Sequence, residues 1–235
     1  MRAVVLVSGG MDSLVTAAKA RRSGRDLVFL HVIYGQRTAA REQRAFDDIA
    51  DFYRPRRRLV ADIAYLRTIG GSALTDPAAP VPQEGALSPG GASAAADAAG
   101  IPATYVPFRN AHLLSIAASL AEVEAAGEIW IGASEVDYSG YPDCRRIFFD
   151  AFERVIDAGT RPDTSISVVT PLMDMSKGRI VREGLRLGAP FELSWSCYVE
   201  SEEACGRCES CRLRLAGFAD AKVRDPIAYS QRAGS

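Results

Sequence analysis

Ser8-Gly9-Gly10-Met11-Asp12-Ser13 is the stretch that decides how this chain folds. The apolar run over residues 2–7 precedes it and predicts a strand buried on both faces. The Ala-rich run over residues 14–22 follows it and predicts a helix, which Gly24 ends. Two adjacent glycines allow a tight turn with consecutive exposed N–H groups, and the helix adds the positive end of its dipole. The stretch therefore predicts a phosphate or pyrophosphate site.

The spacing within this loop separates it from other phosphate-binding loops. It is not Gly-x4-Gly-Lys-Ser/Thr, because no Lys follows the glycines, and it is not Gly-x-Gly-x-x-Gly. Ser-Gly-Gly-x-Asp-Ser after a first strand resembles the PP-loop of ATP pyrophosphatases. Those enzymes split ATP into AMP and pyrophosphate while adenylating a substrate oxygen. The alternative is a tight turn in which Asp12 or Ser13 only caps a helix.

The composition indicates one sizeable globular domain, which we expect over residues 1–226 with a tail over 227–235. The chain has 235 residues, of which 48% are hydrophobic and 24% charged. A net charge of −1 does not favour a protein that coats nucleic acid or an anionic membrane. No stretch has transmembrane length or the form of a secretory signal. We therefore expect a cytoplasmic protein whose cysteines are reduced thiols or metal ligands.

Apolar runs alternate with amphipathic runs along most of the chain, which predicts a doubly wound parallel α/β sheet. Further strands are expected over residues 26–33, 58–63, 128–131 and 166–170. Helices are expected over residues 38–53, 110–126 (ended by Gly127), 147–156 and 176–188. The helix over 147–156 is apolar enough to be buried, and Ser176 can cap the last one. Ligands of such sheets bind beyond the carboxyl ends of the strands, where the glycine loop lies.

Residues 70–100 interrupt this alternation. Ala, Gly, Pro and Ser dominate them, and they include no Lys, Arg or aromatic residue. Such a segment cannot bury enough apolar surface to order itself fully. We expect an insertion that forms either a mobile loop or a lid over the site.

The cysteines near the end of the sequence follow a metal-binding pattern. Cys197, Cys205, Cys208 and Cys211 form Cys-x7-Cys-x2-Cys-x2-Cys. Four thiolates leave no open coordination position, so the segment over 197–211 predicts a structural Zn²⁺ site. An iron–sulfur cluster and unmetallated thiols are the alternatives.

Two basic residues and one loop supply the candidate binding groups. Lys177 begins a helix near the sheet's carboxyl end and could neutralise phosphate charge, although it could also face solvent. Arg109 offers a fork for a carboxylate or phosphate. The loop over 137–145 offers tyrosines that could stack on a flat ring and acidic groups that could accept from ring N–H and amino groups. An ordinary polar surface loop is the alternative.

Several short motifs together resemble the 7-cyano-7-deazaguanine synthase family of the queuosine pathway, within the PP-loop ATP pyrophosphatase superfamily. The similarity spans roughly residues 2–226. Its motifs are the PP-loop, Tyr34-Gly35-Gln36, Val106-Pro107-x-Arg109-Asn110, Asp137-Tyr138-Ser139-Gly140-Tyr141-Pro142-Asp143-Cys144-Arg145, Pro171-Leu172, Ser176-Lys177 and Trp195-Ser196-Cys197-Tyr198 with the three later cysteines.

This resemblance implies an adenine nucleotide alpha hydrolase-like fold and a carbon–nitrogen ligase. The implied substrates are 7-carboxy-7-deazaguanine, ammonia and two ATP. The first ATP adenylates the carboxylate, and ammonia displaces AMP to give an amide. The second ATP activates the amide oxygen, whose loss gives the nitrile. The resemblance also implies structural Zn²⁺, Mg²⁺ with ATP, a homodimer, and no direct contact with nucleic acid or membrane.

The motifs assign roles to individual residues. Asp12, Ser13 and Lys177 are expected to carry catalysis. The expected ATP-binding residues are Val7, Ser8, Gly9, Gly10, Met11, Asp12, Ser13, Leu14 and Lys177. The expected substrate-binding residues are Arg109, Asp137, Tyr138, Tyr141, Asp143 and Arg145. The expected metal ligands are Cys197, Cys205, Cys208 and Cys211.

Two positions depart from the family pattern and leave alternatives open. Thr38 stands where members usually have His, and Arg41 stands where they often have an acidic residue, with Glu42 next to it. A divergent relative could stop at the amide or join the activated deazaguanine to another amine. A PP-loop tRNA-modifying enzyme is a further alternative, against which stand the near-neutral charge and the lack of an RNA-binding extension. A non-catalytic nucleotide-binding protein has only Thr38 in its favour.

Overall fold

A five-stranded parallel sheet forms the centre of the protein, in the order β3-β2-β1-β4-β5. The computed structural model describes residues 1–82, 97–135 and 140–230. The strands are β1 (Arg2–Leu6), β2 (Asp26–Ile33), β3 (Arg57–Asp62), β4 (Glu128–Trp130) and β5 (Ser167–Val169). The chain winds outward from β1 to β3, then returns to the other side of β1 to form β4 and β5. The predicted doubly wound sheet is confirmed, and its switch point lies between β1 and β4.

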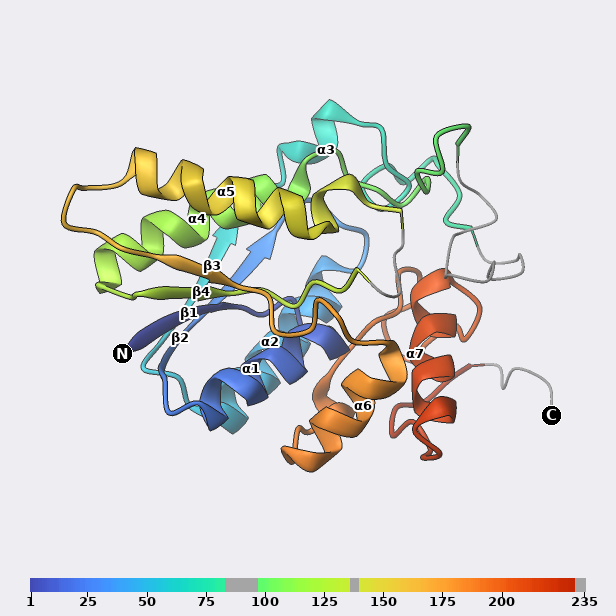
Figure 1. Cartoon of the computed structure of the whole chain (residues 1–235). Coiled ribbons are helices and arrows are strands. Elements are labelled where there is room, and N and C mark those ends of the chain that lie inside the picture. The colour runs from blue at the N-terminus through green and yellow to red at the C-terminus, as the bar shows by residue number, and fades with distance from the viewer. Residues whose placement is uncertain (83–96, 136–139, 231–235) are drawn as a thin grey trace.

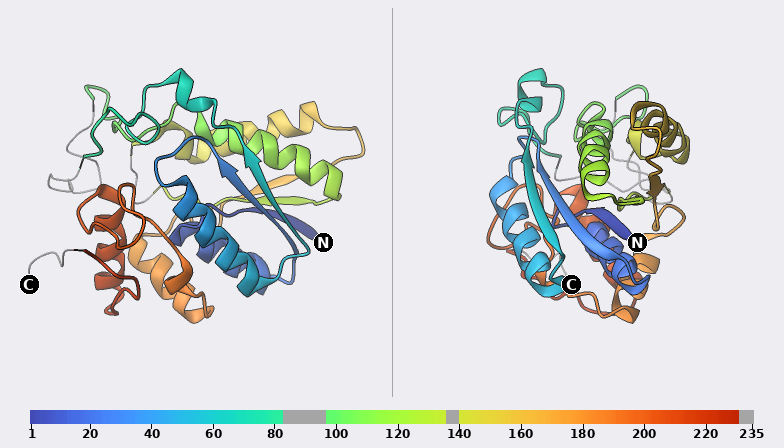
Figure 2. Two further views of the ribbon diagram at one scale, coloured as in Figure 1. Left: turned by 180° about the vertical axis from the view of Figure 1, so that it is seen from behind. Right: turned by 90° about the vertical axis from the view of Figure 1, so that its left-hand side faces the viewer.

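Helices cover both faces of the sheet, as Figures 1 and 2 show. One face carries α1 (Met11–Arg22), α2 (Ala39–Tyr53) and α6 (Lys177–Arg186), and the other carries α4 (Arg109–Glu124) and α5 (Arg146–Gly159). The remaining helices are α3 (Leu66–Ile69), α7 (Glu209–Asp220) and the short 3-10 helices η1 (Pro142–Cys144) and η2 (Phe191–Leu193). None of the helices in the described ranges has the length and apolar character needed to cross a membrane.

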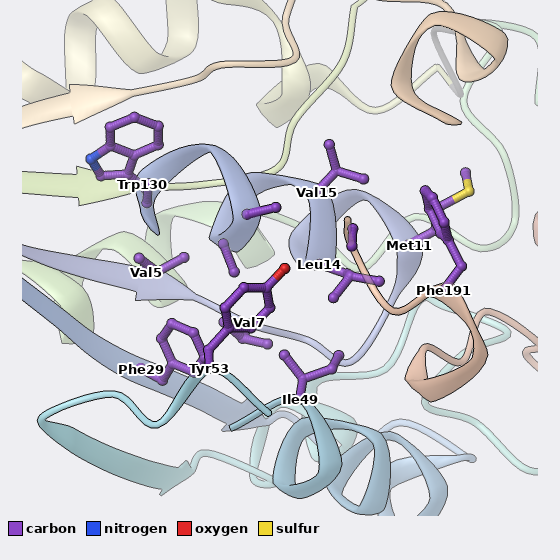
Figure 3. Packing of buried hydrophobic residues seen from close by; sticks show 14 of the residues in the cluster. Val5, Val7, Met11, Leu14, Val15, Phe29, Ile49, Tyr53, Trp130 and Phe191 are labelled. Atoms are coloured by element: carbon purple, nitrogen blue, oxygen red, sulfur yellow. The ribbon is translucent and has the colours of Figure 1, made fainter. Parts of the chain in front are cut away.

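Alternate residues of each strand enter different cores. Val5 of β1 and Phe29 of β2 pack with α1 and α2, in the core drawn in Figure 3. Val4 and Leu30 point the other way and pack with α4. Because both of their faces are covered, β1 and β2 read as nearly continuous apolar runs, and this explains why the sequence pattern located them accurately.

The predicted capping residue is confirmed for α6, but the predicted end of α4 is wrong. Ser176 caps α6 as predicted, since its Oγ accepts from the N–H of Arg179 at 3.4 Å. Gly127 does not end α4. The helix stops at Glu124, and Ala125 takes the left-handed conformation with φ of +49°.

The helix α5 is not buried in the way its composition suggests. Phe149 and Ile156 are buried, but Ile147 and Val155 are 69% and 60% exposed. Some of the apolar side chains of this outer helix pack toward the sheet, and the others face solvent. The expectation of a buried helix over 147–156 is therefore wrong.

The Ala/Gly/Pro segment is more ordered at its start than its composition predicts. Ala73, Leu74 and Val81 are all at least 93% buried. Ala73 and Val81 pack with the cysteine segment, and Leu74 packs with Tyr34. Small apolar residues suffice here because neighbouring segments supply the rest of the core. Residues 83–96 lie outside the described residues.

A buried ion pair fixes the end of the described chain. Arg214 of α7 donates from Nε and Nη2 to the two carboxylate oxygens of Asp225 at 2.7 and 2.9 Å, and both side chains are at most 3% exposed. Arg214 also donates to the Oγ of Ser194 at 2.8 Å. The hydroxyl of Tyr229 donates to Asp225 at 2.7 Å, so residues 227–230 pack against the domain.

Replacing Arg214 by leucine is expected to lower the free energy of unfolding by about 3–5 kcal/mol, because Asp225 would stay buried without its cation. Denaturant titration followed by circular dichroism measures this loss. Arg182→Leu is the control, since its pair with Asp220 is about half exposed and contributes at most about 1 kcal/mol. Equal losses in the two variants would contradict the prediction.

Candidate active site

A cavity of about 280 Å³ opens at the carboxyl ends of β1, β2 and β4. This is where a doubly wound sheet binds its ligands. Its wall comes from the glycine loop, the end of β2, the starts of α4 and α6, and the segment over 195–214. The predicted site residues on this wall are Val7, Ser8, Gly10, Met11, Asp12, Ser13, Arg109, Tyr141 and Lys177.

The glycine loop is held tightly between two neighbouring segments. Gly9 has φ of +87°, and a Cβ there would lie 2.6 Å from the carbonyl oxygen of Glu42. A Cβ on Gly132, at the end of β4, would lie 2.9 Å from the carbonyl of Asp12. The N–H of Gly10 donates to Ser8 Oγ at 3.3 Å. Only glycine fits at positions 9 and 132, and the close packing there fixes the path of the loop.

Two predicted ATP-binding residues lie off the cavity wall. Leu14 is fully buried in the core beneath α1, and α2 covers Gly9. Ser13 lies on the wall, where its Oγ donates to the carbonyl of Gly10 at 2.9 Å and lies 3.2 Å from Ser8 Oγ. Leu14 therefore contributes to packing, and the polar groups of the loop face the cavity.

Asp12 and Lys177 form an ion pair at the mouth of the loop. The Nζ of Lys177 lies 2.6 Å from Oδ2 of Asp12, and the two side chains are 15% and 29% exposed. The other carboxylate oxygen, Oδ1, is buried without a hydrogen-bond partner among the described residues. A carboxylate oxygen of this kind is a ligand that Mg²⁺ prefers. The pair therefore places a cation and an oxygen that could bind a metal ion beside the glycine loop, which would be the phosphate loop of the site.

Arg109 lies between two tyrosines on the opposite wall. It donates to the hydroxyl of Tyr34 at 3.2 Å, and its guanidinium carbon is 5.2 and 5.8 Å from the ring centroids of Tyr34 and Tyr141. Burial raises the pKa of both tyrosines, so they stay neutral. The Nε of Arg109 is buried with no hydrogen-bond acceptor among the described residues. A bound anion could supply that acceptor.

The remaining residues of the predicted substrate loop have other positions. Asp143 is 3% exposed, and its Oδ2 accepts from the N–H of Asn110 at 2.8 Å, at the start of α4. Arg145 is exposed, and its Nε donates to the carbonyl of Pro142 at 2.9 Å. Neither lies on the cavity wall. Asp137 and Tyr138 lie outside the described residues.

Several wall residues were absent from the predicted site. They are Tyr34, Glu42, Trp195, Ser196, Tyr198 and Arg214, among others. Tyr34 directly follows β2, so its place at the carboxyl edge of the sheet could have indicated it. Arg41, one of the two departures from the family pattern, stacks on Trp195 with its guanidinium carbon 4.3 Å from the ring centroid.

The four cysteines form a compact cluster that could hold a metal ion. Their sulfur atoms all lie within 4.8 Å of one another, and every one of these residues is at least 99% buried. The N–H groups of Val199, Glu200 and Cys205 donate to Cys197 Sγ at 3.3–3.4 Å. Such donors stabilise negative charge on sulfur, as a thiolate ligand requires.

Two contacts join this cysteine segment to the Asp12–Lys177 region: one reaches the glycine loop and the other reaches α6. The N–H of Trp195 donates to the carbonyl of Gly9 at 2.8 Å. The helix α7, which carries Cys211, packs closely on α6, where a Cβ on Gly217 would lie 2.8 Å from the Cβ of Lys177. The cysteine segment therefore supports both the loop and the residue that pairs with Asp12.

The model of the queuosine biosynthesis protein QueC family matches residues 2–222, which include both the phosphate loop and the four cysteines. The chain belongs to this family. Its QueC-family relatives include the 7-cyano-7-deazaguanine synthase of Chlorobaculum parvum, which is 53% identical over 99% of this chain and 98% of the relative. The 7-cyano-7-deazaguanine synthase of a Chlorobium phaeobacteroides strain is 54% identical over the same shares.

The QueC-family chain is also similar to a solved structure of a 4-thiouridine synthetase–RNA complex with bound ATP. The TM-score is 0.48 at 15% identity, and the similarity covers 94% of this chain and 53% of that one. A likeness of this size carries no weight for or against RNA as a ligand.

Proposed function

We propose that this chain is a 7-cyano-7-deazaguanine synthase that converts 7-carboxy-7-deazaguanine and ammonia to 7-cyano-7-deazaguanine with two ATP. One observation carries the proposal. A single cavity is lined by the phosphate loop with its Asp12–Lys177 pair and by the half-buried Arg109, which lies between Tyr34 and Tyr141. Identity of 53% to relatives with that name supports the choice of substrate.

The reaction needs a carboxylate to become an acylating agent. Adenylation converts a carboxylate oxygen into a leaving group, and ammonia then displaces AMP to form the amide. The same chemistry on the amide oxygen gives the nitrile. The N–H groups of the loop and the ammonium of Lys177 would stabilise the charge that develops on pyrophosphate. Asp12 would hold Mg²⁺ through its Oδ1, and the bound ion would neutralise part of the phosphate charge.

The reaction also requires that the substrate oxygen is positioned against ATP and that water is excluded from the site. The substrate oxygen must lie roughly 3–3.5 Å from the α-phosphorus, so the two subsites must share one cavity. Arg109 would orient the substrate carboxylate against the loop. An acyl-adenylate is easily hydrolysed, and the buried rings of Tyr34, Tyr141 and Trp195 would limit the access of water. We propose a substrate-binding role for Asp137, Tyr138, Asp143 and Arg145 on the resemblance alone.

The accompanying assignments rest on the same resemblance. The four-cysteine cluster would hold structural Zn²⁺, since four thiolates leave no position for substrate. The protein would act in the cytoplasm, where its buried thiols stay reduced. It would form a homodimer, and exposed apolar side chains such as Ile69 and Ile147 offer surface for one.

Incubation with 7-carboxy-7-deazaguanine, ammonium, ATP and Mg²⁺ is expected to give the nitrile together with AMP and pyrophosphate. Mass spectrometry identifies the deazaguanine product, and chromatography identifies the spent nucleotide. ADP and orthophosphate in stoichiometric amounts would contradict the proposed cleavage. An amide as the final product would instead indicate a divergent family member that stops at the amide. This is the alternative that the sequence raised at Thr38.

A further inference from the structure

Glu42 places a carboxylate of fixed orientation on the cavity wall, although the family motifs do not mark it. It lies in the first turn of α2. Its Oε1 accepts from the hydroxyl of Thr38 at 2.7 Å, and its Oε2 accepts from the amide of Gln36 at 3.0 Å. Gln36 is held in turn, because its Oε1 accepts from the N–H of Tyr34 at 2.9 Å.

The supporting residues are buried, so the carboxylate has little freedom to turn. Gln36 and Thr38 are 5% and 6% exposed. Each carboxylate oxygen carries one protein donor and keeps further acceptor capacity. The hydrogen bonds therefore fix Glu42 and leave it able to accept from a ligand in the cavity.

Glu42 also has no cationic partner within residues 1–82, 97–135 and 140–230. None of the ion pairs among the described residues involves it, whereas Asp12 on the same cavity has Lys177. Its backbone lies against Gly9 of the phosphate loop, where ATP would bring more negative charge. A carboxylate in a closed site costs free energy unless donors or a cation satisfy it. The cavity is therefore complementary to a ligand with N–H donors at this point.

We infer that Glu42 determines substrate specificity by accepting two N–H donors from the pyrimidine edge of the deazaguanine: the ring N–H and the adjacent exocyclic amino group. This inference rests on the proposed function. Two parallel donors on one planar edge match the two oxygens of one carboxylate. Tyr34, Trp195 and Tyr198 line the same cavity and offer apolar surface for a flat ring. Gln36 and Thr38 are positioning residues for Glu42.

Magnesium is the competing ligand for Glu42, and the structure favours the base. Mg²⁺ bound with ATP sits at the phosphates and takes one or two carboxylates. Asp12 lies in the loop itself, and its buried Oδ1 has no hydrogen-bond partner among the described residues. The carboxylate of Glu42 is instead held by Gln36 and Thr38, which lie outside the glycine loop, although its backbone carbonyl lies close to Gly9. In this assignment Thr38, at the position where the family usually has His, orients Glu42 through its hydroxyl.

The test compares Glu42→Gln with the wild type on two substrates, 7-carboxy-7-deazaguanine and its analogue without the 2-amino group. The wild type is expected to prefer the parent by at least about 100-fold in kcat/KM, because the analogue lacks the amino group that would donate to Glu42. Glu42→Gln is expected to raise KM for the parent at least about tenfold and to reduce the preference to a few-fold. KM for ATP and the Mg²⁺ requirement are expected to stay within about twofold of the wild-type values.

Two further variants separate recognition from general damage. Asp48→Asn makes a comparable change at an exposed position of the same helix and is expected to leave both substrates unaffected. Thr38→Val removes one of the donors that hold Glu42 and is expected to reproduce part of the lost preference. Circular dichroism and the ATP KM verify that each variant is folded.

The outcomes distinguish this inference from the proposed function. Turnover of the parent by the wild type, with the preference retained in Glu42→Gln, would overturn the role of Glu42 alone. A raised Mg²⁺ requirement with unchanged base selectivity would assign Glu42 to the metal and also overturn it. Absence of both turnover and binding of the deazaguanine acid by the wild type would overturn the proposed function, and the inference with it.

Discussion

Replacing Lys177 by methionine is expected to lower kcat for AMP formation by roughly 10²- to 10³-fold. Methionine is unbranched and only one atom shorter than lysine, and it removes the charge 2.6 Å from Asp12, beside the loop that would hold the departing pyrophosphate. In the proposed role the ammonium would stabilise charge that develops during the reaction, so kcat should fall more than KM rises. Steady-state kinetics with ATP and the carboxylate substrate measure both constants.

Lys19→Met is the matched control for this experiment. Lys19 also forms an ion pair, with Glu183 at 3.3 Å, and its side chain is 22% exposed, but it lies outside the cavity. Its replacement should leave kcat unchanged. Lys177→Arg should recover only part of the activity, since a planar fork cannot replace a compact charge in this space. A Lys177→Met enzyme within threefold of the wild type would rule out the proposed role.

Cys208→Ser is expected to abolish metal binding and to reduce strongly the yield of soluble, folded protein. The wild type should contain about one zinc per chain, and binding free energies of structural zinc are about 10–16 kcal/mol in small peptides. The cluster is the centre of a small core that includes Trp195, Ala73 and Val81. Loss of the metal would therefore loosen the segment that supports the phosphate loop. Metal analysis by mass spectrometry and thermal unfolding would follow both effects.

Cys144 provides the control, because it is the one cysteine outside the cluster. Cys144→Ser should retain the metal and a melting temperature near that of the wild type. Iron in place of zinc would identify the cluster as a different centre. A Cys208→Ser protein with unchanged stability would show that the metal does not hold the fold together.

The sheet and the phosphate loop could be predicted from sequence because their causes are local. A strand buried on both faces is a continuous apolar run, and the glycines of the loop mark a turn with positive φ. The alternation of these strands with helices then predicts a parallel, doubly wound sheet. The exposed face of α5 could not be predicted in this way, since Ile147 and Val155 are apolar residues that the protein leaves at the surface.

The cavity wall was only partly predictable because its contacts join distant parts of the chain. Arg109 and Tyr34 are separated by 75 positions and meet only after α4 packs on the sheet. Residue type identifies a side chain that could bind a ligand, but not the direction in which it points. Asp143 illustrates this, since its carboxylate turns to the start of α4. Glu42 illustrates the converse, since its place on the wall depends on Gln36 and Thr38.

The hydrogen bond between Trp195 and Gly9 has a consequence for protein synthesis. A ribosome makes the phosphate loop early and the segment over 195–214, which closes the cavity behind it, much later. Throughout that interval the nascent chain would carry the loop without the wall that shields it. A reactive adenylate formed in the proposed reaction could therefore not be protected on an incomplete chain, and ATP consumption would become productive only after the cysteine segment has folded.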